Sequence, residues 1–443
     1  MSFEMIQANL SDFIDFRNGK SSPDRVPKGE FDVYGSNGVI GQCAETNAPE
    51  FSLIIGRVGS YCGSVYQSKK ACWVTDNAII GALKNKNESD FWYFLLTKLN
   101  INSMRSGSGQ PLINQKILNS IQVTVPKSSK VRENIGNYLS LFNEKIKINE
   151  DVNQTLELMA QALFKSWFVD FEPVKAKIRV LEAGGSHEDA TLAAIAAISG
   201  KDADELVVFE HKHPVQNSEL HATAQLFPSA LQESKLGKIP EKWTISEIGK
   251  EIDIVGGGTP STKISEFWDN GDIHWTTPKD LSGLQDKILI STERKISQSG
   301  LSKISSGLLP IDTVLMSSRA PVGYLAISKV PIAINQGYIA MKCSYELSPE
   351  FVLQWCAANM PEILARASGT TFAEISKKNF NPILMVKPPA HLVNVYTQKT
   401  KLLYSFIENN CKQTRELINI REAITPKLLS GEISIEEISN GVL

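Results

Sequence analysis

The chain has 443 residues, of which 42% are hydrophobic and 21% charged, and its formal net charge is −2. This length predicts two or three domains with sizeable cores, and the near-neutral charge argues against a free-standing, purely electrostatic nucleic-acid binder. The N-terminal stretch MSFEMIQANLSDF does not fit a secretion signal, and no segment has the length and apolarity of a transmembrane helix. The six cysteines form no CxxC pair, so we expect neither a disulfide framework nor a zinc site, and a cytoplasmic location is the simplest setting.

Residues 1–130 are predicted to form a mixed domain of short strands and turns. The segment FDVYGSNGVIGQC (31–43) places glycines among β-forming residues, as expected of tight turns between strands. FSLIIGRVGSYCGSVY (51–66) and CWVTDNAIIGALK (72–84) are apolar, β-branched runs broken by glycine. A further apolar run stops at Pro126 and closes the domain.

A long helix is predicted from Val131 to Phe171, within a segment bounded as 131–175. Its middle is polar, at Asn149 and Asn153, and Pro173 is expected to close the run. At 1.5 Å per residue the helix would be roughly 50–60 Å long, which is too long for an ordinary core helix. The apolar residues recur at the three- and four-residue spacing that keeps one stripe of a helix against a partner; they are Ile135, Leu139, Phe142, Ile146, Leu156, Ala160 and Leu163.

Three further segments follow the long helix. Residues 176–235 have Ala-rich helical content and then a polar stretch, and we expect an inter-domain connection rather than a third core domain. A second mixed domain is predicted over 236–389, and a second long helix with a tail over 390–443. In that helix, Asn410 and Gln413 are polar between apolar positions with the same spacing as before, namely Leu403, Phe406, Leu417, Ile420 and Ile424.

The two halves of the chain are an internal repeat. A shift of 262 residues lays SGSGQPLINQKILNSIQVTVP (106–126) on SGTTFAEISKKNFNPILMVKP (368–388) without a gap, and it lays Arg57 on Arg319. We expect the two long helices to pack antiparallel as a coiled coil, with Asn149 and Asn153 facing Asn410 and Gln413 in a polar layer that fixes register. The predicted fold class is therefore α/β (α+β), with two mixed domains related by a pseudo-twofold and separated by two long antiparallel helices.

The ordered phrases of the chain resemble the specificity subunit of Type I restriction–modification systems. In the first half these phrases are YGSNGVIG (34–41), WVTDNA (73–78), SGQPLI (108–113) and LFKSWFVDFEPV (163–174). In the second half they are KLGKIPEKW (235–243), GGTPST (257–262), WTTPKDL (275–281), SSRAPVG (317–323), AINQG (333–337), SGTTF (368–372) and PKLLSGEI (426–433). The connection over 176–235 is the least typical part.

The resemblance implies two target recognition domains, 1–130 and 236–389, separated by helical spacers that fix the gap in a bipartite DNA target. It also implies two modification subunits that bind S-adenosylmethionine, and restriction subunits that use ATP and Mg²⁺, as partners in phage defence. This chain itself is expected to bind no cofactor and no metal. A scaffold or orphan inhibitor that occupies modification subunits without directing them to DNA is the alternative.

Motifs for catalysis are missing from the sequence. An adenine methyltransferase needs a (D/N/S)PP(Y/F) loop, whereas Pro388-Pro389 is preceded by Lys387 and followed by Ala390. There is no Walker A sequence, and Pro23-Asp24 is followed by no ExK nuclease motif. His211 and His213 are better explained as solvated surface residues than as metal ligands, because no third ligand is evident. We therefore expect a non-catalytic subunit.

Polar and basic side chains on loops are the candidates for DNA contact, since base edges are read by hydrogen bonds. For each of them, turn chemistry, a phosphate contact or, for the arginines, a brace to a buried carboxylate is an open alternative. In the first domain the candidates are Lys20, Ser36, Asn37, Arg57, Asn77, Arg105, Ser108 and Gln110. In the second domain they are Thr259, Ser261, Thr262, Thr276, Thr277, Lys279, Ser318, Arg319, Asn335, Gln336, Thr370 and Thr371.

The helices supply the candidates for helix packing and partner binding. For Trp167 and Phe168 packing is the default expectation, and a docking surface is the alternative that the resemblance favours. The full set is Leu139, Phe142, Ile146, Leu156, Leu163, Trp167, Phe168, Leu403, Phe406, Leu417, Ile420 and Ile424.

Overall fold

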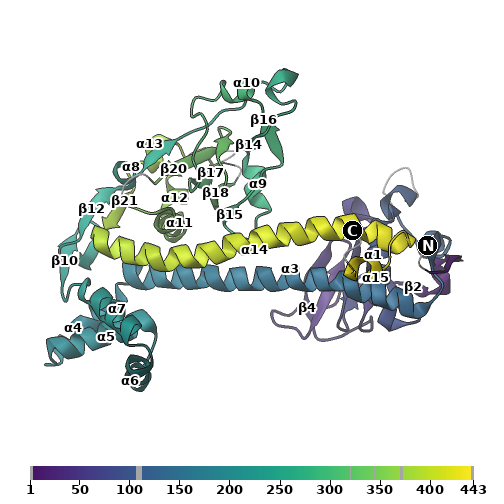
Figure 1. Ribbon diagram of the computed structural model, residues 1–443, viewed down its shortest axis with the longest axis horizontal. Coiled ribbons are helices and arrows are strands. Elements are labelled where there is room, and N and C mark those ends of the chain that lie inside the picture. Colours follow the sequence, from purple (N-terminus) through teal and green to yellow (C-terminus); the bar gives the residue numbers. More distant parts are fainter. Residues whose placement is uncertain (1–2, 106–111, 320, 344–345, 370–372, 441–443) are drawn as a thin grey trace. The chain divides into compact units, whose positions relative to one another are not determined.

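The computed structural model describes residues 3–105, 112–319, 321–343, 346–369 and 373–440 (Figure 1). It divides into two compact units, Met1–Lys147 with Thr414–Leu443, and Ile148–Gln413. Two long helices, α3 (Ser129–Phe164) and α14 (Ala390–Ser430), each contribute residues to both units. Within the described ranges no helix has the length and apolarity needed to cross a membrane.

The first unit is built on an antiparallel sheet with the strand order β2-β8-β5-β6. The central strand β5 is buried along its whole length because β8 and β6 flank it and α1 packs on it. A smaller sheet has the order β4-β3-β7, and β1 pairs with β9. The strands are β1 (Met5–Asn9), β2 (Ile14–Asn18), β3 (Phe31–Gly35), β4 (Gly38–Cys43), β5 (Ser52–Gly56), β6 (Val65–Ser68), β7 (Trp73–Val74), β8 (Ala78–Leu83) and β9 (Gln122–Pro126). The short helices are α1 (Ser89–Lys98), α2 (Gln115–Asn119) and α15 (Ile435–Ser439).

The main core of the first unit lies between α1, the sheet and the ends of the two long helices. Phe91 and Trp92 of α1 are buried against Leu53 of β5, Leu139 of α3 and Leu428 of α14. The sheet, α1 and the ends of the long helices therefore share one hydrophobic core in this unit.

The second unit repeats this plan. Its main sheet has the order β13-β20-β17-β18, extended by β15, and its smaller sheet has the order β16-β14-β19. In each smaller sheet the middle strand has one antiparallel and one parallel neighbour. The strands are β10 (Leu231–Ser234), β11 (Gly237–Pro240), β12 (Thr244–Glu247), β13 (Asp253–Val255), β14 (Ile273–Thr276), β15 (Ile288–Leu289), β16 (Arg294–Ile296), β17 (Val314–Ser318), β18 (Val322–Ser328), β19 (Ile332–Ile334), β20 (Tyr338–Lys342) and β21 (Leu384–Lys387). The short helices of this half are α8 (Ile248–Glu251), α9 (Pro278–Ser282), α10 (Gln298–Leu301), α11 (Pro349–Ala358), α12 (Met360–Ala365) and α13 (Lys377–Phe380).

The internal repeat found in the sequence is also a repeat of secondary structure elements. A shift of 262 residues carries β5 (Ser52–Gly56) onto β17 (Val314–Ser318), the buried central strand of each main sheet. The edge strand β9 corresponds in the same way to β21, and each pairs with the strand that opens its domain, β1 or β12. The expected mixed α/β architecture with a repeated domain is confirmed.

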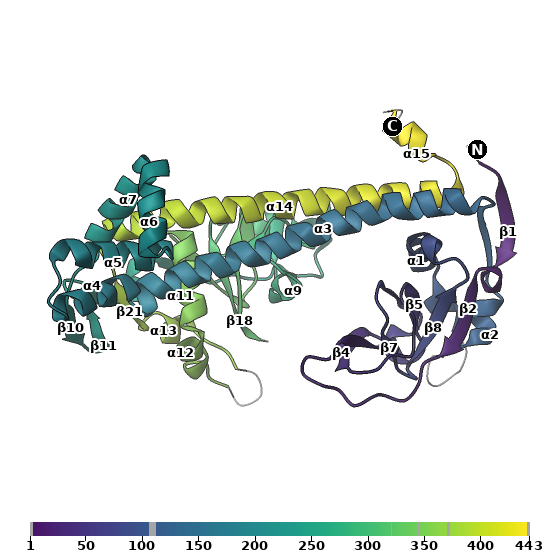
Figure 2. The ribbon, with the colours of Figure 1, turned by 90° about the horizontal axis from the view of Figure 1, so that it is seen from below.

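The long helices pack antiparallel within each unit. In the second unit α3 and α14 lie side by side (Figure 2), and Asn149 Nδ2 donates to Gln413 Oε1 at 3.0 Å while Asn410 Nδ2 donates to Asn153 Oδ1 at 2.8 Å. In the first unit Arg421 of α14 donates to Asn143 of α3. Residue numbers rise along one helix as they fall along the other, and the predicted polar layer is confirmed.

The first helix is shorter than expected. It ends at Phe164, a π-helical turn follows over Lys165–Val169, and Phe171 has a left-handed backbone with φ 54°. Pro173 then lies in the first turn of a new helix, α4, where the missing N–H of proline costs no hydrogen bond. The prediction that Pro173 closes one continuous helix over 131–175 was wrong, because a helix start tolerates proline as well as a helix end does.

The segment after α3 is more compact than a surface connection. It forms four helices, and Ala194, Ile195, Leu220 and Ala224 are buried among them as a small core. Ser186 and Asp202 start two of these helices with capping boxes. The helices are α4 (Glu172–Glu182), α5 (His187–Ser199), α6 (Ala203–Lys212) and α7 (Pro214–Gln225).

Most predicted packing residues of the helices are buried or half-buried, with two exceptions on α14. Phe406 is 62% exposed and Ile420 is 46% exposed, whereas Tyr404 and Ile407 are buried. The seam of α14 is therefore shifted by one residue from the predicted stripe around Phe406. Trp167 and Phe168 are buried against Phe351, Tyr396 and other rings, so they pack internally and are not a docking surface.

Candidate nucleic-acid interface

The loop after β13 is held against the smaller sheet of the second unit by its backbone. Gly258 N–H donates to Ile334 O at 2.9 Å. A Cβ on Gly257 would lie only 2.0 Å from that same carbonyl oxygen, so glycine is required for this close approach. Two indoles also donate to the loop, Trp275 Nε1 to Gly258 O at 3.2 Å and Trp268 Nε1 to Ser261 O at 3.0 Å.

These anchors leave the side chains of the loop on the surface. Thr259, Ser261 and Thr262 are exposed. Thr259 Oγ1 donates to Oε1 of the exposed Gln336 at 2.6 Å, which joins the loop to the turn after β19. Four of the predicted residues, Thr259, Ser261, Thr262 and Gln336, therefore belong to one polar surface whose backbone is held by these hydrogen bonds, an arrangement suited to reading base edges.

The neighbouring candidates on β14 and α9 have structural roles. Thr276 is fully buried and its hydroxyl is hydrogen-bonded to that of Tyr338, so the prediction that it contacts DNA was wrong. Thr277 is part-buried, and its N–H donates to Asp280 at the start of α9. Lys279 is exposed and pairs with Glu293 at 2.9 Å, and this hydrogen bond raises the pKa of the lysine.

The candidates at the end of β17 are largely internal. Ser318 is only 3% exposed, and its backbone is bonded to Gly337 and Ile375, so it is a second incorrect assignment. Arg319 is half-buried and its backbone bridges to Glu374. Asn335 accepts the Gly337 N–H at 2.8 Å through its side chain, which is turn chemistry. Thr370 and Thr371 lie outside the described residues, as do Ser108 and Gln110 of the first domain.

In the first unit, several predicted residues meet where the main sheet lies next to the smaller sheet, near the ends of β5 and β3. Arg57 N–H donates to Asn77 O at 2.9 Å and its guanidinium donates to Asp76 O at 3.2 Å. Ser36 lies close by, because its carbonyl oxygen would be 2.8 Å from a Cβ on Gly56. The structure thus brings Ser36, Arg57 and Asn77 together, with Asn37 exposed on the same turn as Ser36.

Two other basic candidates of this unit are surface residues. Lys20 is exposed beside Thr75, to which its backbone bridges. Arg105 is exposed and donates to Asn102 Oδ1 at 3.1 Å. Unlike Thr276 and Ser318, which are buried, Lys20 and Arg105 have exposed side chains and remain candidates for DNA contact.

One basic residue of the second unit was missed by the sequence analysis. The guanidinium carbon of Arg294 lies 3.7 Å from the ring centroid of Trp268 and 5.3 Å from that of Trp275. These are the two indoles that hold the loop at Gly258 and Ser261. The sequence spacing of Arg294 and Trp268 did not predict this contact. It arises in the tertiary structure, because β16 pairs Arg294 with Trp275 of β14 and Trp268 packs against Trp275.

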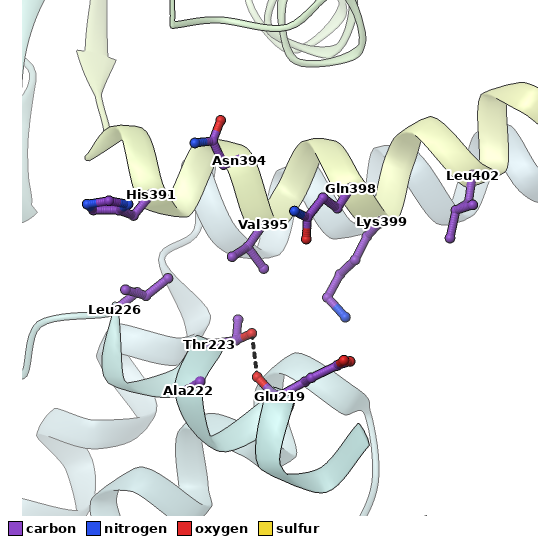
Figure 3. A pocket seen from close by; sticks show the side chains of 10 residues that line it. All are labelled: Glu219, Ala222, Thr223, Leu226, His391, Asn394, Val395, Gln398, Lys399 and Leu402. Atoms are coloured by element: carbon purple, nitrogen blue, oxygen red, sulfur yellow. Dashed lines mark hydrogen bonds between the residues drawn. The ribbon is translucent and has the colours of Figure 1, made fainter. Parts of the chain in front are cut away.

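A cleft elsewhere in the second unit does not belong to this polar surface. It has a volume of about 660 Å³ and lies between α7 and the start of α14 (Figure 3). Val395, Gln398 and Leu402 of α14 face Glu219 and Thr223 of α7 across it. None of the predicted DNA-contact residues lines it.

Comparisons with known proteins agree on one family. Residues 5–158 and 240–390 match the Type I restriction modification DNA specificity domain. The Type I restriction enzyme HindI specificity subunit of Haemophilus influenzae is 30% identical over 337 residues, covering 74% of this chain and 72% of that protein. The MjaIX specificity subunit of Methanocaldococcus jannaschii is 33% identical over 191 residues, covering 43% of this chain and 44% of that protein.

The fold has a counterpart among solved structures. The crystal structure of the Type-I restriction-modification system S subunit from M. genitalium matches with a TM-score of 0.57 at 14% sequence identity, covering 96% of both chains. At that identity the match concerns the fold alone. Both halves of the repeat match the same DNA specificity domain, and the chain belongs to the family of DNA specificity subunits of Type I restriction–modification systems.

Proposed function

We propose that this chain gives a Type I modification and restriction complex a bipartite DNA target, each recognition domain reading one half-site. The observation that carries the proposal is the repeat of topology. In the first unit β5 pairs antiparallel with β6 and β8, and in the second unit β17 pairs antiparallel with β18 and β20 in the same arrangement. Each unit presents polar loop residues beside its sheets, around Arg57 in the first and Thr259 in the second. Two similar domains suit a target of two half-sites, just as each subunit of a dimeric DNA-binding protein binds one half-site.

The long helices would set the number of unspecified base pairs between the half-sites. Both α3 and α14 continue without a break from one unit into the other. The hydrogen bonds of Asn149 with Gln413 and of Asn153 with Asn410 support a single antiparallel register. A polar layer of this kind fixes the register of a coiled coil at some cost in stability.

In this proposal the chain is not an enzyme, and the chemistry belongs to its partners. Modification subunits would bind S-adenosylmethionine and flip the target adenine, while restriction subunits would use ATP and Mg²⁺. Support comes from the sequence, which has no Walker A motif and no (D/N/S)PP(Y/F) loop.

The modification subunits would dock on the long helices. Apolar side chains remain exposed on these helices beyond what their own pairing uses, including Leu158 and Met159 of α3 and Leu402 and Phe406 of α14, each more than half exposed. Such surfaces on a polar helix are typical of protein contacts. A scaffold that binds modification subunits without directing them to DNA would use the same surface.

A matched insertion in both helices tests the proposal. One heptad is added after Lys147 in α3 and one after Gln413 in α14, so that the pairing on either side is kept. The addition lengthens the pair by roughly 10 Å, which equals the rise of about three base pairs. Co-expression with the modification subunit, followed by mapping of methylated adenines, is expected to show the same half-sites separated by a gap longer by one to about three base pairs.

The same experiment separates the alternatives. An insertion in α3 alone is the control, because it breaks the register and should abolish methylation. An unchanged gap in the doubly extended chain would contradict the role of the helices as a spacer. A wild-type complex that assembles with the modification subunit but neither binds nor methylates duplex DNA would favour the scaffold.

A further inference from the structure

Arg294 lies on an aromatic platform at the edge of the 256–262 loop. It is the first residue of β16, and its cross-strand partner on β14 is Trp275. Trp268 and Trp275 pack edge-to-face with ring centroids 5.0 Å apart. Trp275 is buried, whereas Arg294 is exposed. The arginine therefore caps the two indoles on the surface of the smaller sheet.

The platform restricts the arginine side chain. With its guanidinium carbon 3.7 Å from the Trp268 ring centroid, the planar group is in cation–π contact with the indole. Among the described residues, this guanidinium contacts the two indole rings and has no hydrogen bond or ion pair. Because the two indoles are nearly perpendicular, only Trp268 is stacked on its face, and that stacking leaves N–H groups at its edge available. A guanidinium held by its face is pre-organised to donate two parallel hydrogen bonds.

The same indole connects the arginine to the loop. Trp268 contacts Arg294 through its ring and donates its Nε1–H to Ser261 O at 3.0 Å. Trp275 is linked in the same way to Gly258 O. The guanidinium of Arg294 and the loop that carries Thr259 and Ser261 are thus connected through the same two indoles.

We propose that Arg294, stacked on Trp268 beside the 256–262 loop, reads a guanine in the half-site of the second recognition domain through paired hydrogen bonds to O6 and N7. This assignment rests on the proposed function. Bidentate arginine–guanine pairing is the most frequent specific contact in the major groove. A phosphate can be contacted by the exposed Lys263, whereas a guanidinium stacked on Trp268 suits a base edge, which has a fixed position in the groove.

The test uses the full chain with its modification subunits and S-adenosylmethionine, acting on unmethylated genomic DNA. Methylated adenines are mapped by single-molecule sequencing for the wild type, Arg294→Lys, Arg294→Ala and Lys295→Ala. The lysine variant keeps the charge but lacks the fork. Lys295 is the matched control, because it is exposed on the same strand and its side chain alternates to the opposite face of the sheet.

We expect both Arg294 variants to lose discrimination by about 10–100-fold at one guanine of one half-site, with the other half-site and the gap unchanged. Lys295→Ala should keep the wild-type motif. Two results would overturn the assignment. One is a motif unchanged in both Arg294 variants, and the other is weaker methylation at all sites with no change of motif, which would mark a phosphate contact. A wild-type complex that methylates without any bipartite motif would instead contradict the proposed function itself.

Discussion

Glu88 and Arg132 form a buried ion pair that ties α3 to the first recognition domain. Arg132 donates from Nε to Glu88 Oε2 at 2.7 Å and from Nη2 to Oε1 at 2.9 Å, and the side chains are 6% and 3% exposed. Ser129 and Trp92 also donate to the same carboxylate. Glu88→Gln removes the charge and presents an amide N–H₂ to these donors.

The expected cost is large because the arginine stays buried. Breaking a buried ion pair by removing one charge typically costs about 3–5 kcal/mol. Arg132 keeps its hydrogen bonds from Nη1 to Pro126 O and Lys127 O, so it cannot turn outward to water without losing them as well. We therefore expect Glu88→Gln to lower the free energy of unfolding of the first unit by about 3–5 kcal/mol.

Hydrogen–deuterium exchange of peptides from α1 (Ser89–Lys98), followed through a urea series, measures this free energy locally. Glu144→Gln is the control, because Glu144 lies on the same helix and pairs with Lys69 at 3.2 Å with both side chains about half exposed. It should cost about 0–1 kcal/mol. A loss below about 1 kcal/mol for Glu88→Gln would refute the reasoning that this pair anchors the domain to the helix.

Three other predictions concern the second unit. Burial raises the pKa of Glu157, but the charge of Lys287 and hydrogen bonds from Lys287, Gln161 and Tyr404 outweigh burial, so the pKa in the folded protein lies below 4.5. Stability of the second unit should therefore be lost as the pH falls from 4.5 through the pKa of the folded state. The urea midpoint of Glu157→Gln should depend less on pH over that range than the midpoint of the wild type. Asn153→Leu leaves Asn410 without its acceptor in the polar layer and should destabilise the helix pair by about 1–3 kcal/mol in thermal unfolding, with partial recovery when Asn410→Leu is added. Gly257→Ala forces the loop away from Ile334 and should degrade only one half-site in methylation maps, whereas Gly258→Ala, whose Cβ would meet nothing within 4 Å, should not.

Features that depend on repetition and local periodicity could be predicted from the sequence. The 262-residue repeat identified two domains of one plan, and β5 and β17 occupy equivalent positions in them. The asparagines at 149 and 153 interrupted an apolar stripe, and that interruption located the polar layer in both helices.

Features that depend on tertiary hydrogen bonds could not be predicted from the sequence. Tyr404 lies on the buried seam of α14 because its hydroxyl donates to Glu157 at 2.7 Å and accepts from Gln354 at 2.6 Å, and nothing in the periodicity distinguishes it from Phe406 on the exposed side. In the sequence Thr276 could not be distinguished from a surface threonine, whereas in the structure it is buried and hydrogen-bonded to Tyr338. Short Ala-rich helices gave no apolar stripe, which is why the core formed by Ala194 and Leu220 was not expected.

Exchange of the first recognition domain tests the central claim most directly. Residues 1–130 are replaced by the corresponding domain of another family member with a different target, and methylated adenines are mapped across a genome for the parent and the hybrid. We predict that one half of the bipartite motif changes to that of the donor while the other half and the gap stay the same. A hybrid that methylates the parent motif in both halves would contradict it.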